Sequence, residues 1–217
     1  MSSQQAKTDH NKFNQMLWYE DEVRQLEANV RSLTLDSKHR GKPQVVFYGS
    51  SSVRLWTTLA QDFPETNLLN LGFGGSTLAA CAWFFERLVV PVAPKSIVFY
   101  AGDNDLGDGR HPEEVFLFFC AFAEKARQLL PNTSLTYLSI KISPSRWNIA
   151  GPIRYANKLI ADEIKQLPNW RMIDMTSPLL GVDGRPRREL FENDGLHLNK
   201  SGYKVWQQVL EGRTEIF

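Results

Sequence analysis

Two short segments, far apart in the sequence, carry residue types that nucleophilic catalysis needs. Gly49-Ser50-Ser51-Ser52 follows an apolar run at residues 45–48, and Asp194-Gly195-Leu196-His197 places a carboxylate three residues before a histidine. A serine at the end of a strand, a histidine and a carboxylate can act as nucleophile, general base and orienting group. Neither segment is diagnostic alone, because serines after a strand are common in turns and an Asp-x-x-His pair is common on surfaces.

A second Asp-x-x-His pair, Asp108-Gly109-Arg110-His111, competes for the role of base and orienting group. His111 immediately precedes Pro112, and proline suits the first turn of a helix. We therefore expect His111 at the start of a helix. Spacing alone does not choose between His111 and His197.

Two further polar segments contain groups that could stabilise negative charge. The glycines of Gly72-Phe73-Gly74-Gly75-Ser76-Thr77 let backbone amides approach a ligand, and Asn104 of Gly102-Asp103-Asn104-Asp105 can donate its side-chain amide. The alternatives are a tight strand-to-helix turn for the first segment and a helix cap or Asx turn for the second. The dinucleotide fingerprint fails at Thr77, and the calcium pattern of an EF-hand fails at Gly107.

The elements that must position these segments follow an alternating pattern. Apolar runs at residues 44–48, 67–71, 96–100, 134–140 and 171–174 indicate strands, and residues 78–89, 112–130, 152–167 and 200–210 indicate helices. This alternation predicts an α/β fold with three layers, α/β/α, around a parallel sheet of about five strands. Ligands of such sheets bind beyond the carboxyl ends of the strands, which is where the polar segments lie.

Bulk properties limit the remaining possibilities. The chain has 217 residues, which fits a single domain over residues 11–217, with an amphipathic helix at 12–33 and a disordered lead at 1–10. A net charge of +1 gives no reason to expect nucleic acid as a partner, and no apolar run approaches the ~20 residues that span a membrane. Cys81 and Cys120 lie among apolar residues, which argues against a disulfide framework or a cysteine metal site. The polar start lacks a signal peptide, so we expect a cytoplasmic protein.

Taken in order, the four polar segments resemble the signature blocks of the SGNH/GDSL hydrolase family, whose sheet is flavodoxin-like. The resemblance places Ser51 at the nucleophile position, Gly75 and Asn104 at the positions of oxyanion donors, and Asp194 and His197 at the positions of orienting acid and base. It thereby selects residues 194 and 197 over 108 and 111. One position departs from the family pattern, since Ser50 stands where the family has aspartate; a sub-group with Gly-Ser-Ser-Ser is similar.

The resemblance implies a serine esterase that works through an acyl-enzyme. The oxyanion hole would consist of the backbone amides of Ser51 and Gly75 and the side chain of Asn104, and no metal or organic cofactor is needed. We expect a small-molecule ester as substrate, with an acetyl or short acyl group on a carbohydrate or another polar alcohol. Arg146 and Trp147, which follow the fourth predicted strand, are candidates for contacts to that alcohol.

Four other interpretations are compatible with the sequence. The chain could be a lysophospholipase or thioesterase that prefers longer acyl groups, or a catalytically silent member of the same fold that binds a ligand. A flavodoxin-like phosphate or nucleotide binder would use the glycines of residues 72–77 but would leave Asp194 and His197 unexplained. The helix at residues 12–33 could also mediate a homodimer.

Overall fold

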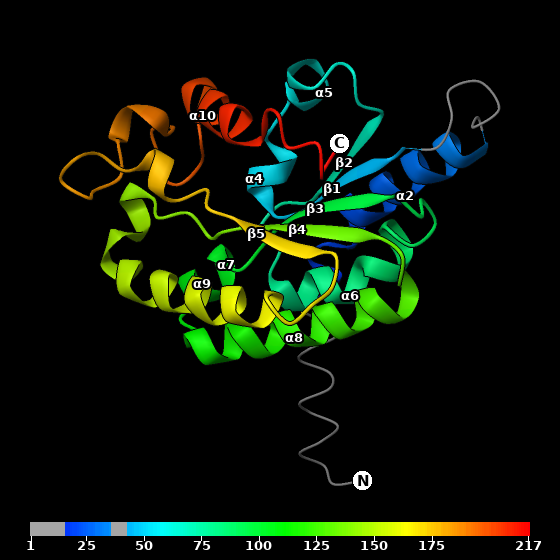
Figure 1. Ribbon diagram of the computed structural model, residues 1–217, viewed down its shortest axis with the longest axis horizontal. Coiled ribbons are helices and arrows are strands. Elements are labelled where there is room, and N and C mark those ends of the chain that lie inside the picture. The colour runs from blue at the N-terminus through cyan, green and yellow to red at the C-terminus, as the bar shows by residue number, and fades with distance from the viewer. Residues whose placement is uncertain (1–15, 36–42) are drawn as a thin grey trace, which may run out of the picture.

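A parallel β-sheet of five strands lies at the centre of the computed structural model, which describes residues 16–35 and 43–217 (Figure 1). The strands are β1 (Val45–Gly49), β2 (Leu68–Gly72), β3 (Ser96–Tyr100), β4 (Ser134–Leu138) and β5 (Trp170–Ile173). Their order across the sheet is β2-β1-β3-β4-β5, and every neighbouring pair is parallel. All five runs predicted as strands are confirmed, with ends shifted by no more than two residues.

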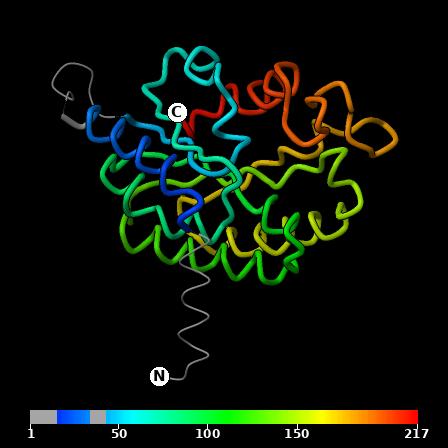
Figure 2. Tube along the Cα trace, turned by 180° about the vertical axis from the view of Figure 1, so that it is seen from behind, coloured from blue at the N-terminus to red at the C-terminus, as the bar shows by residue number. Residues whose placement is uncertain are grey.

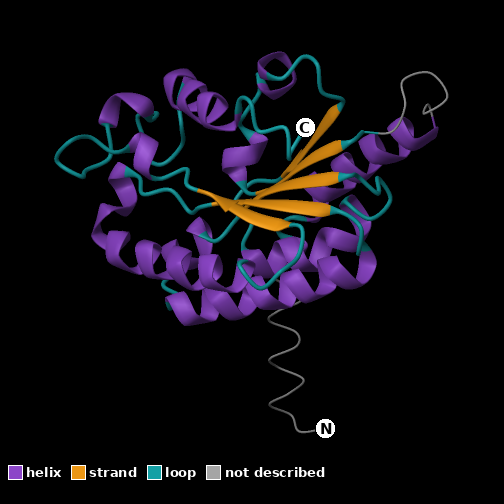
Figure 3. Cartoon of the chain, in the orientation of Figure 1, coloured by secondary structure: helices purple, strands orange, loops and turns teal. Residues whose placement is uncertain are grey.

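Helices cover both faces of the sheet, as the cartoon in Figure 3 shows. One face packs against α2 (Glu20–Leu35), α6 (Leu78–Leu88), α8 (Pro112–Leu129) and α9 (Ala150–Ile164), and the other against α4 (Ser51–Arg54), α5 (Leu59–Asp62) and α10 (Lys200–Leu210). Because successive strand residues point to opposite faces, Val46 and Tyr48 join the first apolar cluster, and Val45 and Phe47 join the second. The predicted three-layer α/β/α fold is confirmed.

Several short helices were not predicted. They are α4, α5, α7 (Asp103–Gly107) and three 3₁₀ turns, η1 (Pro144–Ile149), η2 (Ser177–Leu179) and η3 (Arg188–Leu190). Segments of three to six residues contain too few turns to show a helical period. The longer helix α9 begins at Ala150, directly after η1. The predicted start, Pro152, is its third residue.

The amphipathic helix predicted over residues 12–33 is present as α2 from Glu20 to Leu35, and residues 18–19, inside the predicted range, form a turn before it. The predicted residues 12–15 and the predicted lead at residues 1–10 lie outside the described residues. Val23 and Val30 are buried against the sheet, whereas Leu17 and Leu33, two other apolar residues within the predicted range 12–33, are exposed. Figure 2 shows α2 in blue, seen from behind. In the part of the chain that the structure describes, no helix has the length and apolar character needed to cross a bilayer.

The strand register brings three loops to the same level at one edge of the sheet. Gly49 at the end of β1 pairs with Gly72 at the end of β2 on one side and with Tyr100 at the end of β3 on the other. The chain therefore leaves all three strands side by side, into the segments that contain Ser51, Gly75 and Asn104.

Candidate active site

A sharp turn at the end of β1 presents Ser51. Gly49 has a φ of 135°, and a Cβ atom there would lie 1.8 Å from the Tyr100 carbonyl oxygen, so only glycine fits. The Ser50 N–H donates to that same carbonyl at 2.9 Å, and the Ser50 side chain is buried. Ser51 is then the first residue of α4 and is half-buried.

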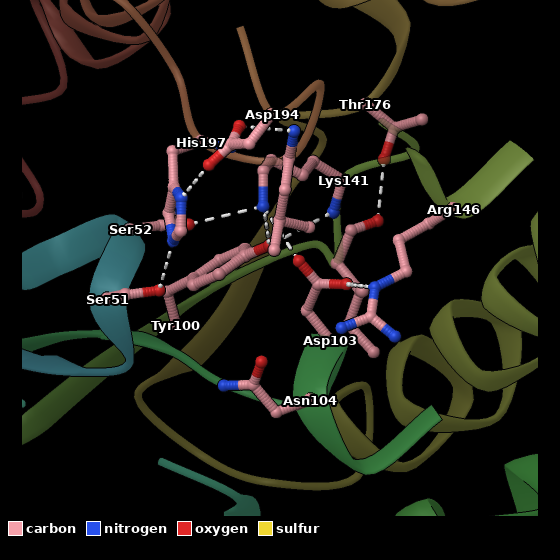
Figure 4. A network of polar contacts seen from close by, with 12 residues as sticks. Ser51, Ser52, Tyr100, Asp103, Asn104, Lys141, Arg146, Thr176, Asp194 and His197 are labelled. Carbon is pink, nitrogen blue, oxygen red and sulfur yellow. Dashed lines mark hydrogen bonds and ion pairs between the residues drawn. The ribbon is translucent and has the colours of Figure 1, made fainter. Parts of the chain in front are cut away.

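His197 connects Ser51 to Asp194 (Figure 4). Its Nε2 lies 3.0 Å from Ser51 Oγ, and its Nδ1 lies 2.6 Å from Asp194 Oδ2. The other carboxylate oxygen of Asp194 accepts the backbone N–H groups of Leu196 and His197, at 2.8 and 3.0 Å. The motif thus folds into a turn in which Asp194 holds both the backbone and the ring of His197.

The charge state of Asp194 fixes the direction of this hydrogen-bond chain. Burial raises the pKa of Asp194, but hydrogen bonds from the Leu196 N–H and from the ring and N–H of His197 outweigh it and lower the pKa to about 2. An ionised carboxylate can only accept, so His197 Nδ1 carries the proton. In the neutral imidazole Nε2 is then an acceptor facing the Ser51 hydroxyl.

The competing pair at Asp108 and His111 is placed differently. His111 is the N-cap residue of α8 and forms a capping box with Glu114, whose carboxylate accepts the His111 N–H at 2.9 Å. This is the helix start that the adjacent proline predicted.

The two candidate donor segments are joined to one another. Asn104, in α7, donates its side-chain amide to the Ser76 carbonyl oxygen at 3.0 Å. The amide carries a second N–H, which remains able to donate elsewhere. Gly75, with a φ of 67°, lies in the same loop as Ser76 and has open space where a side chain would be. We call residues 72–77 the glycine loop.

The acidic residues after β3 have separate partners. Asp105 is buried and accepts the Leu78 N–H at 3.0 Å, and burial raises its pKa to about 6. Asp103 pairs with Lys141 instead. Among residues 16–35 and 43–217, no three His, Cys, Asp or Glu side chains are grouped so that they could hold a metal ion.

Sequence reasoning missed a buried charged cluster that contacts Ser52, the residue after Ser51. The Lys141 ammonium is 1% exposed and lies 2.7 Å from Asp103 Oδ2, 3.2 Å from Ser52 Oγ and 3.2 Å from the Tyr100 hydroxyl (Figure 4). Buried lysines are rare unless they are paired. A lysine between two buried isoleucines, at Ile140-Lys141-Ile142, was the available signal in the sequence.

The two candidate substrate contacts lie on η1, at the rim. Arg146 is 20% exposed, with its Nε 3.8 Å from Asp103 Oδ1, and it lines a hollow that also includes Gly107, Ser145 and Leu196. The Trp147 ring lies within 6 Å of two guanidinium groups, those of Arg154 and Arg185. Arg146 therefore lies closer to the buried cluster, and Trp147 closer to a cationic surface.

The sequence and the fold were both found to be similar to those of known proteins. The model of the GDSL-like lipase/acylhydrolase family matches residues 39–205. A provisionally assigned platelet activating factor from Streptococcus pneumonia superposes with a TM-score of 0.77 at 17% identity, over 98% of this chain and 99% of that one. A GDSL-like lipase from Bacteroides thetaiotaomicron gives 0.67 at 21% identity, over 86% and 97%. No curated protein sequence gives a significant match.

Proposed function

Because the chain belongs to the GDSL-like lipase/acylhydrolase family, we propose that it is a serine esterase in which Ser51, His197 and Asp194 form the catalytic triad. The observation that carries this proposal is the continuous hydrogen-bond chain from Asp194 Oδ2 through the His197 ring to Ser51 Oγ. A nucleophile, a base and an orienting acid linked in this way can activate a hydroxyl at neutral pH.

Acylation begins when Ser51 Oγ attacks the acyl carbonyl carbon and His197 Nε2 takes the hydroxyl proton. The tetrahedral intermediate places its negative oxygen toward the amides of Ser51 and Gly75 and the side chain of Asn104. When the bond to the alcohol breaks, the imidazolium returns its proton to the leaving oxygen. Asp194 stabilises the imidazolium that forms between these steps.

Deacylation repeats the same sequence with water. His197 removes a proton from a water molecule, whose oxygen attacks the acyl carbon of the ester at Ser51. Collapse of the second intermediate releases the carboxylic acid and returns the proton to Ser51 Oγ. The enzyme regains its starting state, with one ester and one water converted to an acid and an alcohol.

We further propose an acetyl or short acyl group on a polar alcohol as the substrate. The Ser51 side chain is half-buried and that of His197 is 26% exposed, which favours a shallow site over a deep acyl pocket. The adjacent hollow is bordered by polar groups of Ser145, Arg146 and Asn148, which could bind hydroxyls of the alcohol.

Substitution of the proposed triad tests the reaction. Ser51→Ala and His197→Ala should each lower kcat on p-nitrophenyl acetate by about 10⁴-fold or more, because the triad acts as a unit. His111→Ala, which removes the side chain of the competing histidine, should leave kcat within about twofold of wild type.

A fluorophosphonate probe separates an active serine from a silent one, since it should label wild type and not Ser51→Ala. Labelling of Ser51→Ala, or loss of turnover only in Ser50→Ala or Ser52→Ala, would assign the nucleophile elsewhere. A series of p-nitrophenyl esters of increasing chain length then tests the acyl group. Faster turnover of long chains would favour the lysophospholipase or thioesterase interpretation.

A further inference from the structure

The first turn of the N-terminal helix region contacts the glycine loop directly. Tyr19, which immediately precedes α2, donates its hydroxyl to the Gly75 carbonyl oxygen at 3.1 Å. Glu22, one turn later, accepts the Gly74 N–H at 2.8 Å. Both residues lie outside the range that the family model matches, which begins at residue 39. These contacts therefore come from outside the segment that the family model matches.

The two contacts lie on either side of one peptide group. Glu22 holds the peptide that ends at the Gly74 N–H, and Tyr19 holds the peptide that starts at the Gly75 carbonyl. Between them lies the peptide whose N–H, that of Gly75, is the proposed oxyanion donor. Gly75 has a φ of 67°, and the space that a side chain would fill at this position is open, so packing within the loop itself does little to fix this direction.

The opposite side of the loop is held by α7. Asn104 donates to the Ser76 carbonyl oxygen, and Asp105 accepts the N–H of Leu78, the first residue of α6. The glycine loop is thus held from both sides. Glu22 also lies 3.4 Å from Arg54 Nε in α4, the helix that begins with Ser51. It therefore links the donor loop to the nucleophile helix.

The helix that supplies these contacts is itself firmly attached. Arg87 of α6 binds Glu20 and Glu27 with four hydrogen bonds of 2.8–2.9 Å. Val23, which lies between these two glutamates in the sequence, is buried. The Tyr19 ring packs edge-on against Phe73 at 5.5 Å. Burial raises the pKa of the Tyr19 hydroxyl, so it keeps its proton and remains a donor.

We propose that Tyr19 and Glu22 are positioning residues that direct the Gly75 N–H into the oxyanion hole. This inference rests on the proposed esterase function. It implies that both side chains act on the transition state through the glycine loop, without touching the substrate. Their removal should therefore lower kcat and leave KM nearly unchanged.

The experiment compares four α2-region variants on p-nitrophenyl acetate. Tyr19→Phe removes one hydroxyl and keeps the ring packing, and Glu22→Ala removes the acceptor of the Gly74 N–H. Glu22→Gln keeps an acceptor oxygen and serves as the rescue. Glu27→Ala is the control, because it weakens the attachment of α2 to Arg87 without touching the glycine loop.

We expect Tyr19→Phe and Glu22→Ala to lower kcat about tenfold each, a fraction of the 10²–10³-fold that losing an oxyanion donor costs. KM should stay within about twofold, and Glu22→Gln and Glu27→Ala should resemble wild type. A trifluoromethyl ketone, whose serine adduct is an oxyanion, should show a Ki that rises by the same factor as kcat/KM falls. Melting temperatures of all four variants show whether loss of folding contributes.

The outcomes distinguish the two proposals. If wild type turns over the ester and Ser51→Ala does not, but Tyr19→Phe and Glu22→Ala keep the wild-type kcat, the positioning role is overturned and the esterase function stands. A Glu22→Gln variant as slow as Glu22→Ala would likewise overturn the role of the Gly74 contact. If wild type neither turns over esters nor reacts with fluorophosphonate, the esterase function fails and the positioning role fails with it.

Discussion

The side chain of Asn104 has two roles to separate, a hydrogen bond that holds the glycine loop and the proposed donation to the oxyanion. Its side-chain amide donates to Ser76, and its second N–H is the proposed oxyanion donor. Asn104→Ala should lower kcat on p-nitrophenyl acetate by about 10²–10³-fold with little change in KM, because an oxyanion forms only after attack. Steady-state kinetics measure both constants.

The matched control is Asn132→Ala, at an exposed turn between α8 and β4. It should have no measurable effect on either constant. A wild-type kcat in Asn104→Ala would leave the amide with only its structural bond to the glycine loop.

Residues of the site differ in how far the sequence could predict them. Ser51, Asn104 and His197 each lie in a short motif, so the residues next to them in sequence marked them. Lys141 and Glu22 gain their importance from partners 38 and 52 residues away, Asp103 and Gly74. No local pattern contains such a pair, and only the folded chain brings it together.

Among the elements, α7 and α6 meet at a buried carboxylate, that of Asp105. Burial raises its pKa from an ordinary 3.8 to about 6 in the folded protein. The folded state therefore holds this proton more tightly than the unfolded state does. The stability that this proton contributes is present below about pH 4 and is lost as the pH rises through 6.

Asp105→Asn removes this titration and keeps an oxygen that can accept the Leu78 N–H. Relative to wild type, the variant should gain free energy of unfolding between pH 4 and pH 7.5, by no more than about 3 kcal/mol, the equivalent of roughly two pKa units. Urea denaturation at a series of pH values measures the difference. A difference that does not change with pH would contradict the assignment.

Elements were predictable in proportion to their length. The strands and the helices α6, α8, α9 and α10 span enough residues for apolar periodicity to emerge. The short helices α4 and α7 have only four and five residues, and they form because tertiary contacts hold them at the strand ends. These two carry Ser51 and Asn104, so the least predictable elements are the ones that present the site.

Across the whole molecule, Lys141 connects the loop after β4 to β3, α4 and α7. Removing Lys141 leaves the buried Asp103 carboxylate with only the more distant Arg146, whose Nε lies 3.8 Å from Asp103 Oδ1. Lys141→Met should therefore lower the free energy of unfolding by about 3–5 kcal/mol, measured by urea denaturation. The double variant Lys141→Met/Asp103→Leu should regain part of this loss, because neither charge then remains.

If the double variant were no more stable than Lys141→Met, the loss of stability would come from altered packing and not from the uncompensated buried charge of Asp103. The pair would then be one contact among many at this end of the sheet.

Fold class was predictable from the alternation of strands and helices, whereas the strand order β2-β1-β3-β4-β5 could be expected only from the resemblance to a family with a flavodoxin-like sheet. The order depends on which side of β1 each crossover turns, and that choice is made by packing between distant segments. It decides which loops become neighbours, and hence that the segments of Ser51, Gly75 and Asn104 share one edge.

The distance along the chain between Ser51 and its proposed base, His197, has a consequence for biosynthesis. The two residues are 146 positions apart, and the base arrives together with its own orienting carboxylate in one turn. During translation the ribosome adds Ser51 to the chain long before it adds His197. Until then the proposed base is missing, so on the proposed mechanism the growing chain cannot form the acyl-enzyme. In the proposed mechanism, Ser51 becomes reactive only after the segment that carries Asp194 and His197 has been made and has reached it.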